Sequence, residues 1–103
     1  MSPSEALVIM VPRQRRDDVV DALMGCEQLG GFTLSLAGGF SREHAQLDLR
    51  ERVQGYRDVE RFEVLCTPEV RSELLERLAA VAGMDRFRYW VLPLLEQGGL
   101  GGR

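Results

Sequence analysis

The side chains best suited to metal chemistry in this sequence are one histidine, His44, and two cysteines, Cys26 and Cys66. Glu43 directly precedes His44, and Asp48 follows four residues later. Imidazole, thiolate and carboxylate groups are the ligands that zinc and copper take from proteins. One hypothesis is therefore a site of His44, Glu43 and Cys66 that binds a transition metal, copper or zinc.

A plainer interpretation of these side chains stays open beside it. A single histidine without a second histidine or a nearby cysteine is a weak metal signal and is equally typical of a solvated loop. Cys26 and Cys66 are too few and too far apart for a disulfide framework or a CxxC site. A buried cysteine more often behaves as a small apolar side chain.

Residue patterns typical of enzymes are not found in the sequence. It contains no Gly-x-Ser-x-Gly elbow, no interpretable Ser/His/Asp set and no clustered cysteines for an iron–sulfur centre. We therefore expect a protein that is not an enzyme.

The charge balance and the apolar runs exclude further classes. The 103 residues include 13 basic ones, all arginine, and 16 acidic ones, for a net charge of −3. This balance does not predict nucleic-acid binding. The apolar runs 6–11 and 89–95 are shorter than the roughly 20 residues of a membrane-spanning helix, so we expect no direct membrane insertion. Since Glu5 precedes the first run and arginines follow it, a signal peptide is not indicated, and we expect a cytoplasmic protein.

The elements that must position these side chains follow from apolar periodicity. Strands are predicted at 6–11, 32–37, 61–66 and 87–92, and helices at 15–26 and 67–83. The order βαββαβ predicts an α+β, ferredoxin-like fold, a four-stranded antiparallel sheet with two helices on one face. We expect a single domain over residues 1–97, followed by a Gly-rich mobile tail at 98–103.

Two helices can cover only one face of such a sheet. The first strand nevertheless has apolar residues on both faces, with Val8 and Met10 opposite Leu7 and Ile9. An uncovered apolar face is costly in water, so the sequence predicts self-association through it.

The connection between the second and third strands is predicted to be long. It reads GGFSREHAQLDLRERVQGYRDVE over residues 38–60, whereas hairpins usually need two to five residues. One interpretation is a solvated loop with a short helical turn, and the other is a functional loop ordered by a ligand or a partner. Its aromatic, apolar and arginine side chains are the candidate partner-docking residues Phe40, Arg42, Leu47, Tyr56 and Arg57.

The segment GFTLSLAGGFSR resembles the entry to the long T-loop of the nitrogen-regulatory PII signalling proteins. The positions that match are Gly31, Thr33, Gly39, Phe40 and Arg42. The closing RYWVLPLLEQGGL is similar to a branch of small PII-like bacterial proteins encoded beside heavy-metal efflux pumps of the resistance-nodulation-division type. The resemblance implies a homotrimer built on the bare sheet face, no reaction, and a ligand site at the loop base, here Gly39, Phe40, Ser41, Arg42 and Glu43.

Two departures from the PII pattern leave the ligand open. Only Met84, Asp85 and Arg86 stand where PII proteins have a second phosphate-cradling loop, and Glu43 replaces a glutamine that meets phosphate and metal. An acid there disfavours a polyphosphate. An adenine nucleotide and a transition metal both stay candidate ligands. The leading hypothesis is a trimeric regulator that docks on a heavy-metal efflux transporter, and the alternative is a metal buffer or sensor that uses His44.

Overall fold

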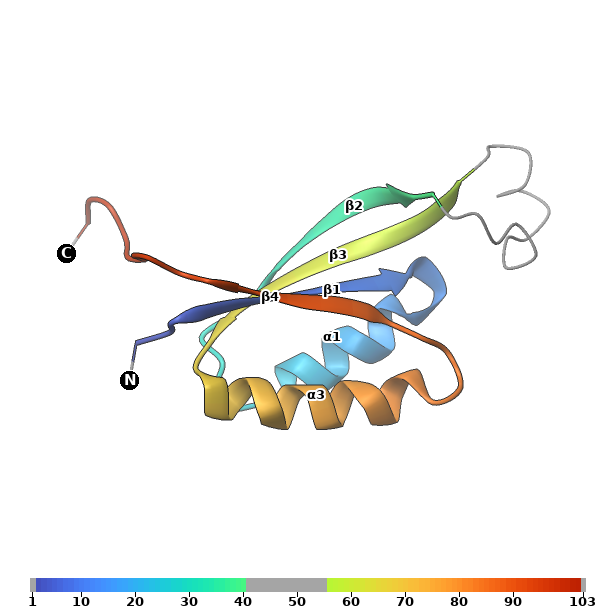
Figure 1. The fold of residues 1–103 in the computed structure, drawn as a ribbon, viewed down its shortest axis with the longest axis horizontal. Helices are drawn as coiled ribbons and strands as arrows, with labels where there is room; N and C mark the ends of the chain where they lie inside the picture. The colour runs from blue at the N-terminus through green and yellow to red at the C-terminus, as the bar shows by residue number, and fades with distance from the viewer. Residues whose placement is uncertain (1, 41–55, 103) are drawn as a thin grey trace.

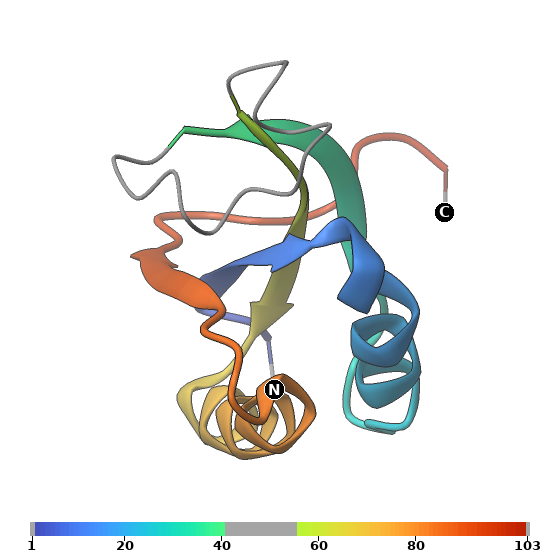
Figure 2. The same cartoon turned by 90° about the vertical axis from the view of Figure 1, so that its right-hand side faces the viewer.

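The computed structural model describes residues 2–40 and 56–102. Within these ranges the strands β1 (Glu5–Pro12), β2 (Thr33–Gly39), β3 (Arg57–Cys66) and β4 (Arg88–Pro93) form one sheet in the order β2-β3-β1-β4. Each neighbouring pair is antiparallel. The helices α1 (Arg16–Met24) and α3 (Pro68–Ala82) lie on one face of the sheet (Figure 1, Figure 2), and the short 3-10 helix η1 (Arg13–Arg15) joins β1 to α1. The predicted ferredoxin-like fold is confirmed.

The hydrophobic core lies between the sheet and the two helices. Successive residues of a strand point to opposite faces, so β1 turns Leu7, Ile9 and Val11 toward the helices. These side chains meet apolar residues of β3 and of both helices, namely Val19, Leu23, Phe62, Val64, Leu74 and Leu78. None of the nine is more than 4% exposed, so this face of the sheet is a close-packed interior.

Helix α3 begins and ends where the sequence predicts. The Thr67 hydroxyl accepts a hydrogen bond from the backbone N–H of Val70 at 3.3 Å, and Pro68 follows in the first turn. Gly83 comes after the helix with a φ of 58°, a left-handed conformation that glycine adopts at little cost. In the described part of the chain no helix combines the length and the apolar character needed to cross a membrane.

The strands β2 and β3 extend further than the sequence predicted. We expected Gly38 and Gly39 to end the second strand, because glycine weakens strand interiors. That prediction is wrong: Gly38 pairs with Asp58 and Gly39 with Arg57. A Cβ atom at position 38 would lie 2.9 Å from Cδ2 of Tyr56. Glycine therefore leaves room for the Tyr56 ring and lets the ladder continue.

The face of the sheet opposite the helices, here called the open face, has an apolar border. Trp90 and Leu92 of β4 and Leu65 of β3 lie on it, 37%, 45% and 37% exposed. Val8 lies between Glu63 and Trp90 and is fully buried within a single chain. The predicted apolar face is thus present, but its centre is already covered by neighbouring side chains.

Candidate functional site

The end of β2 with Phe40 after it, and the start of β3 with Tyr56 before it, form what we call the neck, residues 38–40 and 56–58. The rings of Phe40 and Tyr56 lie 5.3 Å apart between centroids, with an angle of 36° between their planes. This geometry is within the range of attractive aromatic pairs. Phe40 is nevertheless 76% exposed. In Figure 1, β2 and β3 rise away from the helices toward the neck. The neck therefore offers an exposed aromatic surface on a paired strand scaffold.

The neck contains part of the predicted site. Gly39 and Phe40 were expected to bind ligand, and Phe40, Tyr56 and Arg57 were expected to dock a partner; the structure brings these four together. Apart from Cys66, the remaining predicted residues lie outside the described ranges, and their roles stay predictions: Ser41, Arg42, Glu43, His44 and Leu47.

A buried carboxylate with two arginines lies next to the neck. Glu60 pairs with Leu36 in the sheet, on the helix side, and is fully buried. Its Oε1 atom lies 3.4 Å from Nη1 of Arg16 and 3.8 Å from Nε of Arg13. Nη1 of Arg13 is also 3.7 Å from a carboxylate oxygen of Asp58. No group in the described ranges donates a hydrogen bond to Oε2 of Glu60.

This arrangement keeps two guanidinium groups fixed at the surface. The side chains of Arg13 and Arg16 are 45% and 46% exposed, and a guanidinium has five N–H donors. Nε of Arg16 also donates to Asp17 at 3.2 Å, so only the donors that face none of Glu60, Asp58 and Asp17 can meet an oxyanion from solvent.

Sequence reasoning missed the cluster because the third strand was predicted to begin at residue 61, which left Glu60 in a loop. Continuing the alternation of Phe62 and Val64 backward by one more step places Glu60 on the helix side, which is the signal that would have found it.

Cys66, the third member of the metal hypothesis, lies at the end of β3 far from the neck. β3 has ten residues, so at about 3.3 Å per residue its two ends are roughly 30 Å apart. Burial, and to a smaller degree the carboxylate of Glu5, raise the pKa of the Cys66 thiol, while Arg71 opposes them. Because the thiolate is the form that binds metals, this environment disfavours Cys66 as a ligand.

Cys26 is placed as a core residue. It is 3% exposed within the hydrophobic cluster, and its thiol lies 3.3 Å from Oε1 of Gln28. Among residues 2–40 and 56–102, no three His, Cys, Asp or Glu side chains gather closely enough to hold a metal ion. The pairing of His44 with Glu43 lies outside those ranges.

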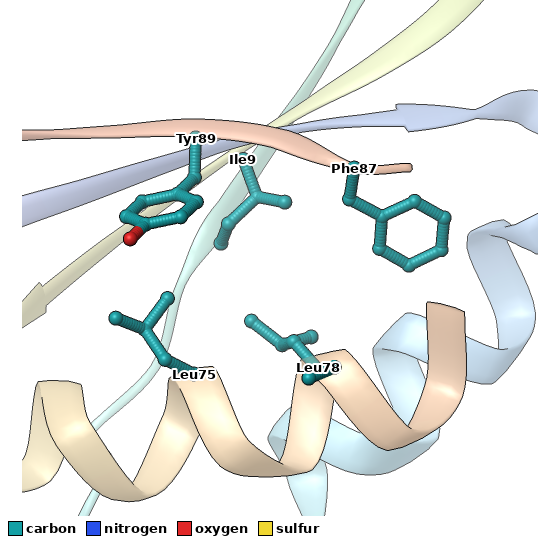
Figure 3. A pocket seen from close by; sticks show the side chains of 6 residues that line it. Ile9, Leu75, Leu78, Phe87 and Tyr89 are labelled. Carbon is teal, nitrogen blue, oxygen red and sulfur yellow. The ribbon is translucent and has the colours of Figure 1, made fainter. Parts of the chain in front are cut away.

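An apolar pocket of about 260 Å³ opens between β4 and α3, a feature that sequence reasoning did not identify. It is lined by Ile9, Leu75, Leu78, Ala79, Phe87 and Tyr89. Figure 3 shows Ile9 and the two rings pointing from the sheet side toward Leu75 and Leu78 of α3. None of the lining residues is charged, and Tyr89 is 53% exposed. Small-molecule sites usually have roughly 300–1,000 Å³, so this pocket suits an apolar side chain better than a cofactor.

Comparison with known proteins adds a family and a fold. A family model described as "Protein of unknown function (DUF3240)" matches residues 1–101. Among solved structures, the chain is similar to the crystal structure of a DUF3240 family protein from Shewanella baltica OS155. The two share 35% sequence identity with a TM-score of 0.81, over 98% of this chain and 100% of the other.

A more distant likeness concerns the fold alone. The structure of a Bacillus cereus protein related to NIF3 matches with a TM-score of 0.69 and 18% identity, over 95% of this chain and 27% of that one. No curated protein matches the chain.

Proposed function

The chain belongs to the DUF3240 family, whose description leaves its function open, and we propose that it is a non-enzymatic, PII-like regulatory protein that acts as a homotrimer. In this proposal the loop segment responds to a small ligand and docks on a partner, which we expect to be a heavy-metal efflux transporter. The trimer, the absence of a reaction and the partner come from the PII-like resemblance of the sequence.

The observation that carries the proposal is the open face. Both helices cover the other side of the sheet, while Trp90, Leu92 and Leu65 leave an apolar border in water. Burying apolar surface contributes about 25 cal/mol per Å². A further copy of the chain is the simplest cover for this border, since the same surface is then buried on each copy.

The neck and its arginines support the regulatory part of the proposal. Aromatic and arginine side chains dominate protein docking surfaces, and Phe40 lies exposed in the neck next to Tyr56, with Arg57 beside them. Arg13 and Arg16 add donors for an anionic ligand at the same end of the sheet. An anion bound there would lie next to the residues expected to contact the partner.

Native mass spectrometry of the purified protein tests the assembly and the ligand together, because it reports the number of subunits and any retained metal or nucleotide. We expect a species of three chains. A single chain at micromolar concentration, confirmed by light scattering, would overturn the proposal.

Titration calorimetry with copper, zinc, ATP and ADP separates a regulator from a metal buffer. For a regulator, we expect Arg42→Ala to weaken the binding of the anionic ligand, since a charge-assisted hydrogen bond contributes roughly 1.5 to 3 kcal/mol. His44→Ala should leave that binding unchanged.

The opposite result would favour the metal-binding alternative. In that case His44→Ala removes most of the affinity for copper or zinc, and binding weakens below about pH 6 as the imidazole takes up a proton. No heat with any of the four ligands would contradict both ligand hypotheses.

The partner is tested with a purified efflux transporter of the resistance-nodulation-division type from the same genome. Phe40→Ala should weaken binding at least tenfold in a surface-immobilised assay, because it removes the exposed ring of the neck. Met24→Ala is a matched control, since Met24 is 71% exposed on α1. Equal binding by both variants would contradict docking through the neck.

A further inference from the structure

A row of paired residues crosses the open face toward its neck end. In the strand register Ser35 pairs with Arg61, Arg61 with Met10, and Met10 with Arg88. Directly paired residues share a face of the sheet, and Ile9, the neighbour of Met10, faces the helices. The side chains of Arg61 and Arg88 therefore lie on the open face, one on each side of Met10.

The charge of the open face is opposite to that of the whole chain. Among the described strand residues, the charged ones on this face are Arg57, Arg61, Glu63 and Arg88. Three arginines and one glutamate give this face a charge of +2, whereas the chain has a net charge of −3. The other acids of β3, Asp58 and Glu60, alternate to the helix side. The open face is therefore basic toward the neck.

The two arginines of the row differ in how their charge is balanced. Nη2 of Arg61 donates to Oε1 of Glu63 at 3.0 Å. Arg88 is exposed, and its side chain forms no hydrogen bond or ion pair with any residue of the ranges 2–40 and 56–102. The five N–H donors of its guanidinium are consequently open to solvent in a single chain.

Assembly through the open face would bring these charges together. In the proposed trimer the open faces of three copies meet around one axis, so three Arg88 side chains point into the space between the copies. Like charges repel, and a cation removed from water without a partner is costly. Glu63, the acid that the described strands place on this face, already bonds to Arg61. The three Arg88 groups therefore need an anion from solution.

We propose that the trimer binds one phosphate-type oxyanion on its threefold axis, held by the Arg88 side chains of the three copies. This axial site rests on the proposed function, since it is incomplete in a single chain. A guanidinium forms two parallel hydrogen bonds with a phosphate group. Trp90 lies two residues from Arg88 on the same face, so the apolar border adjoins the site on the side away from the neck. Apolar surroundings strengthen ion contacts.

The symmetry of the axial site favours a small anion with several equivalent oxygens. Three identical guanidinium groups around one axis present more donors than the two oxygens of a carboxylate can accept. The same symmetry fixes the stoichiometry at one anion for three chains. A ligand at the loop base would instead bind once to each chain, so the two sites are distinguishable by stoichiometry.

Titration calorimetry with inorganic phosphate and with ATP, in separate arms, tests the axial site. We expect one bound anion for three chains, and at least tenfold weaker binding by Arg88→Gln. Arg86→Gln is the matched control, because it removes the same charge at an exposed position before β4 and should bind like the unmodified chain. Binding in the phosphate arm identifies the free anion, and binding in the ATP arm alone identifies the phosphate group of a larger molecule. Circular dichroism checks the fold of both variants.

An anion that binds only the assembled chains should also stabilise the assembly. Sedimentation velocity over a dilution series compares phosphate with chloride at equal ionic strength, which keeps general screening the same. We expect phosphate to lower the concentration at which the trimer dissociates at least tenfold. Arg88→Gln should dissociate at the same concentration in both salts, while Arg86→Gln should respond like the unmodified chain.

Three outcomes overturn the inference. If the unmodified chain sediments as a single chain in both salts, the proposed function fails and the inference fails with it. If it forms a species of three chains but binds neither compound, or binds equally well after Arg88→Gln, only the axial site is excluded and the trimer stands. Binding of one anion to each chain also excludes the axial site and leaves the trimer in place.

Discussion

The carboxylate of Glu60 is fully buried, whereas the arginines that balance its negative charge are half-exposed. Arg13 and Arg16 approach one oxygen of its carboxylate from the surface. Breaking a buried ion pair from one side costs about 3–5 kcal/mol, because an uncompensated charge stays behind. Since solvent reaches these arginines, we expect Arg13→Gln/Arg16→Gln to lower the free energy of unfolding by about 3 kcal/mol. Urea denaturation measures this loss.

A third substitution tests whether the buried charge causes that loss. Glu60→Gln in the background of the two arginine variants removes the charge and should restore most of the stability. Arg77→Gln is the control, since it removes an exposed ion pair with Glu73 and should change stability by less than about 1 kcal/mol. If the three substitutions destabilise additively, the charge of Glu60 is not the cause.

Cys66 makes the free energy of unfolding fall as the pH rises into the alkaline range. Because burial raises the pKa of its thiol, the unfolded chain releases this proton at a lower pH than the folded chain does. The contribution of Cys66 to stability is complete below the pKa of the unfolded chain, about 8.5, and is lost as the pH rises through the folded pKa. We expect Cys66→Ala to flatten the decline of unfolding free energy between roughly pH 8 and 10. Urea denaturation at several pH values measures how steeply the free energy of unfolding falls with pH in the unmodified chain and in Cys66→Ala. Cys26→Ala is the control. Equal slopes in the unmodified chain and in Cys66→Ala would contradict the effect.

At the scale of elements, the neck depends on the missing side chain of Gly38. A Cβ atom there would approach Cδ2 of Tyr56 to 2.9 Å, which is too close without a shift of the ring. Over-packing of this kind costs roughly 1–3 kcal/mol, so Gly38→Ala should lower the free energy of unfolding by about 1 kcal/mol or more. Gly30→Ala is the matched control, because a Cβ at Gly30 meets nothing within 4 Å. Thermal denaturation compares the two variants, and equal midpoints would mean that the Tyr56 ring yields freely.

The elements that local rules specify were predictable from the sequence. Helix α3 has its cap at Thr67, its proline in the first turn and its stop at Gly83, so its bounds follow from nearby residues. The order of strands and helices along the chain followed from periodicity in the same way, and the single covered face followed from that order.

Features that depend on distant residues were not predictable. Gly38 and Gly39 read locally as a strand end, but pairing with β3 and the ring of Tyr56 keep them in the ladder. The pocket brings β1, β4 and α3 together, and the burial of Glu60 depends on arginines more than forty positions away in the chain. Alternation in β3 can place Glu60 on the helix side, but its contacts with the arginines and the lining of the pocket have no local signature.

At the scale of the whole molecule, the described residues leave three surfaces of the sheet without a neighbouring element: the open face and the two sheet edges, β2 and β4. A single chain covers the centre of the open face, as the full burial of Val8 shows, but leaves Trp90 and Leu92 at its border. Assembly therefore has to be tested at the border. Val8→Asp would place an unpaired carboxylate inside the single chain and unfold it, so it cannot distinguish folding from assembly.

Leu92→Asp separates the two processes. Leu92 pairs with Ala6 on the open face and is 45% exposed, so an aspartate at this position stays hydrated in a single chain. In the assembly the same carboxylate would be buried without a partner, which costs several kcal/mol in each subunit. We expect light scattering to show single chains for Leu92→Asp. Its circular dichroism spectrum should match that of the unmodified chain, and its urea transition should be that of a folded protein. Leu95→Asp makes the same change three residues later, after β4, where Leu95 is fully exposed, and should leave the assembly intact. If Leu92→Asp assembles like the unmodified chain, the copies do not meet through the open face.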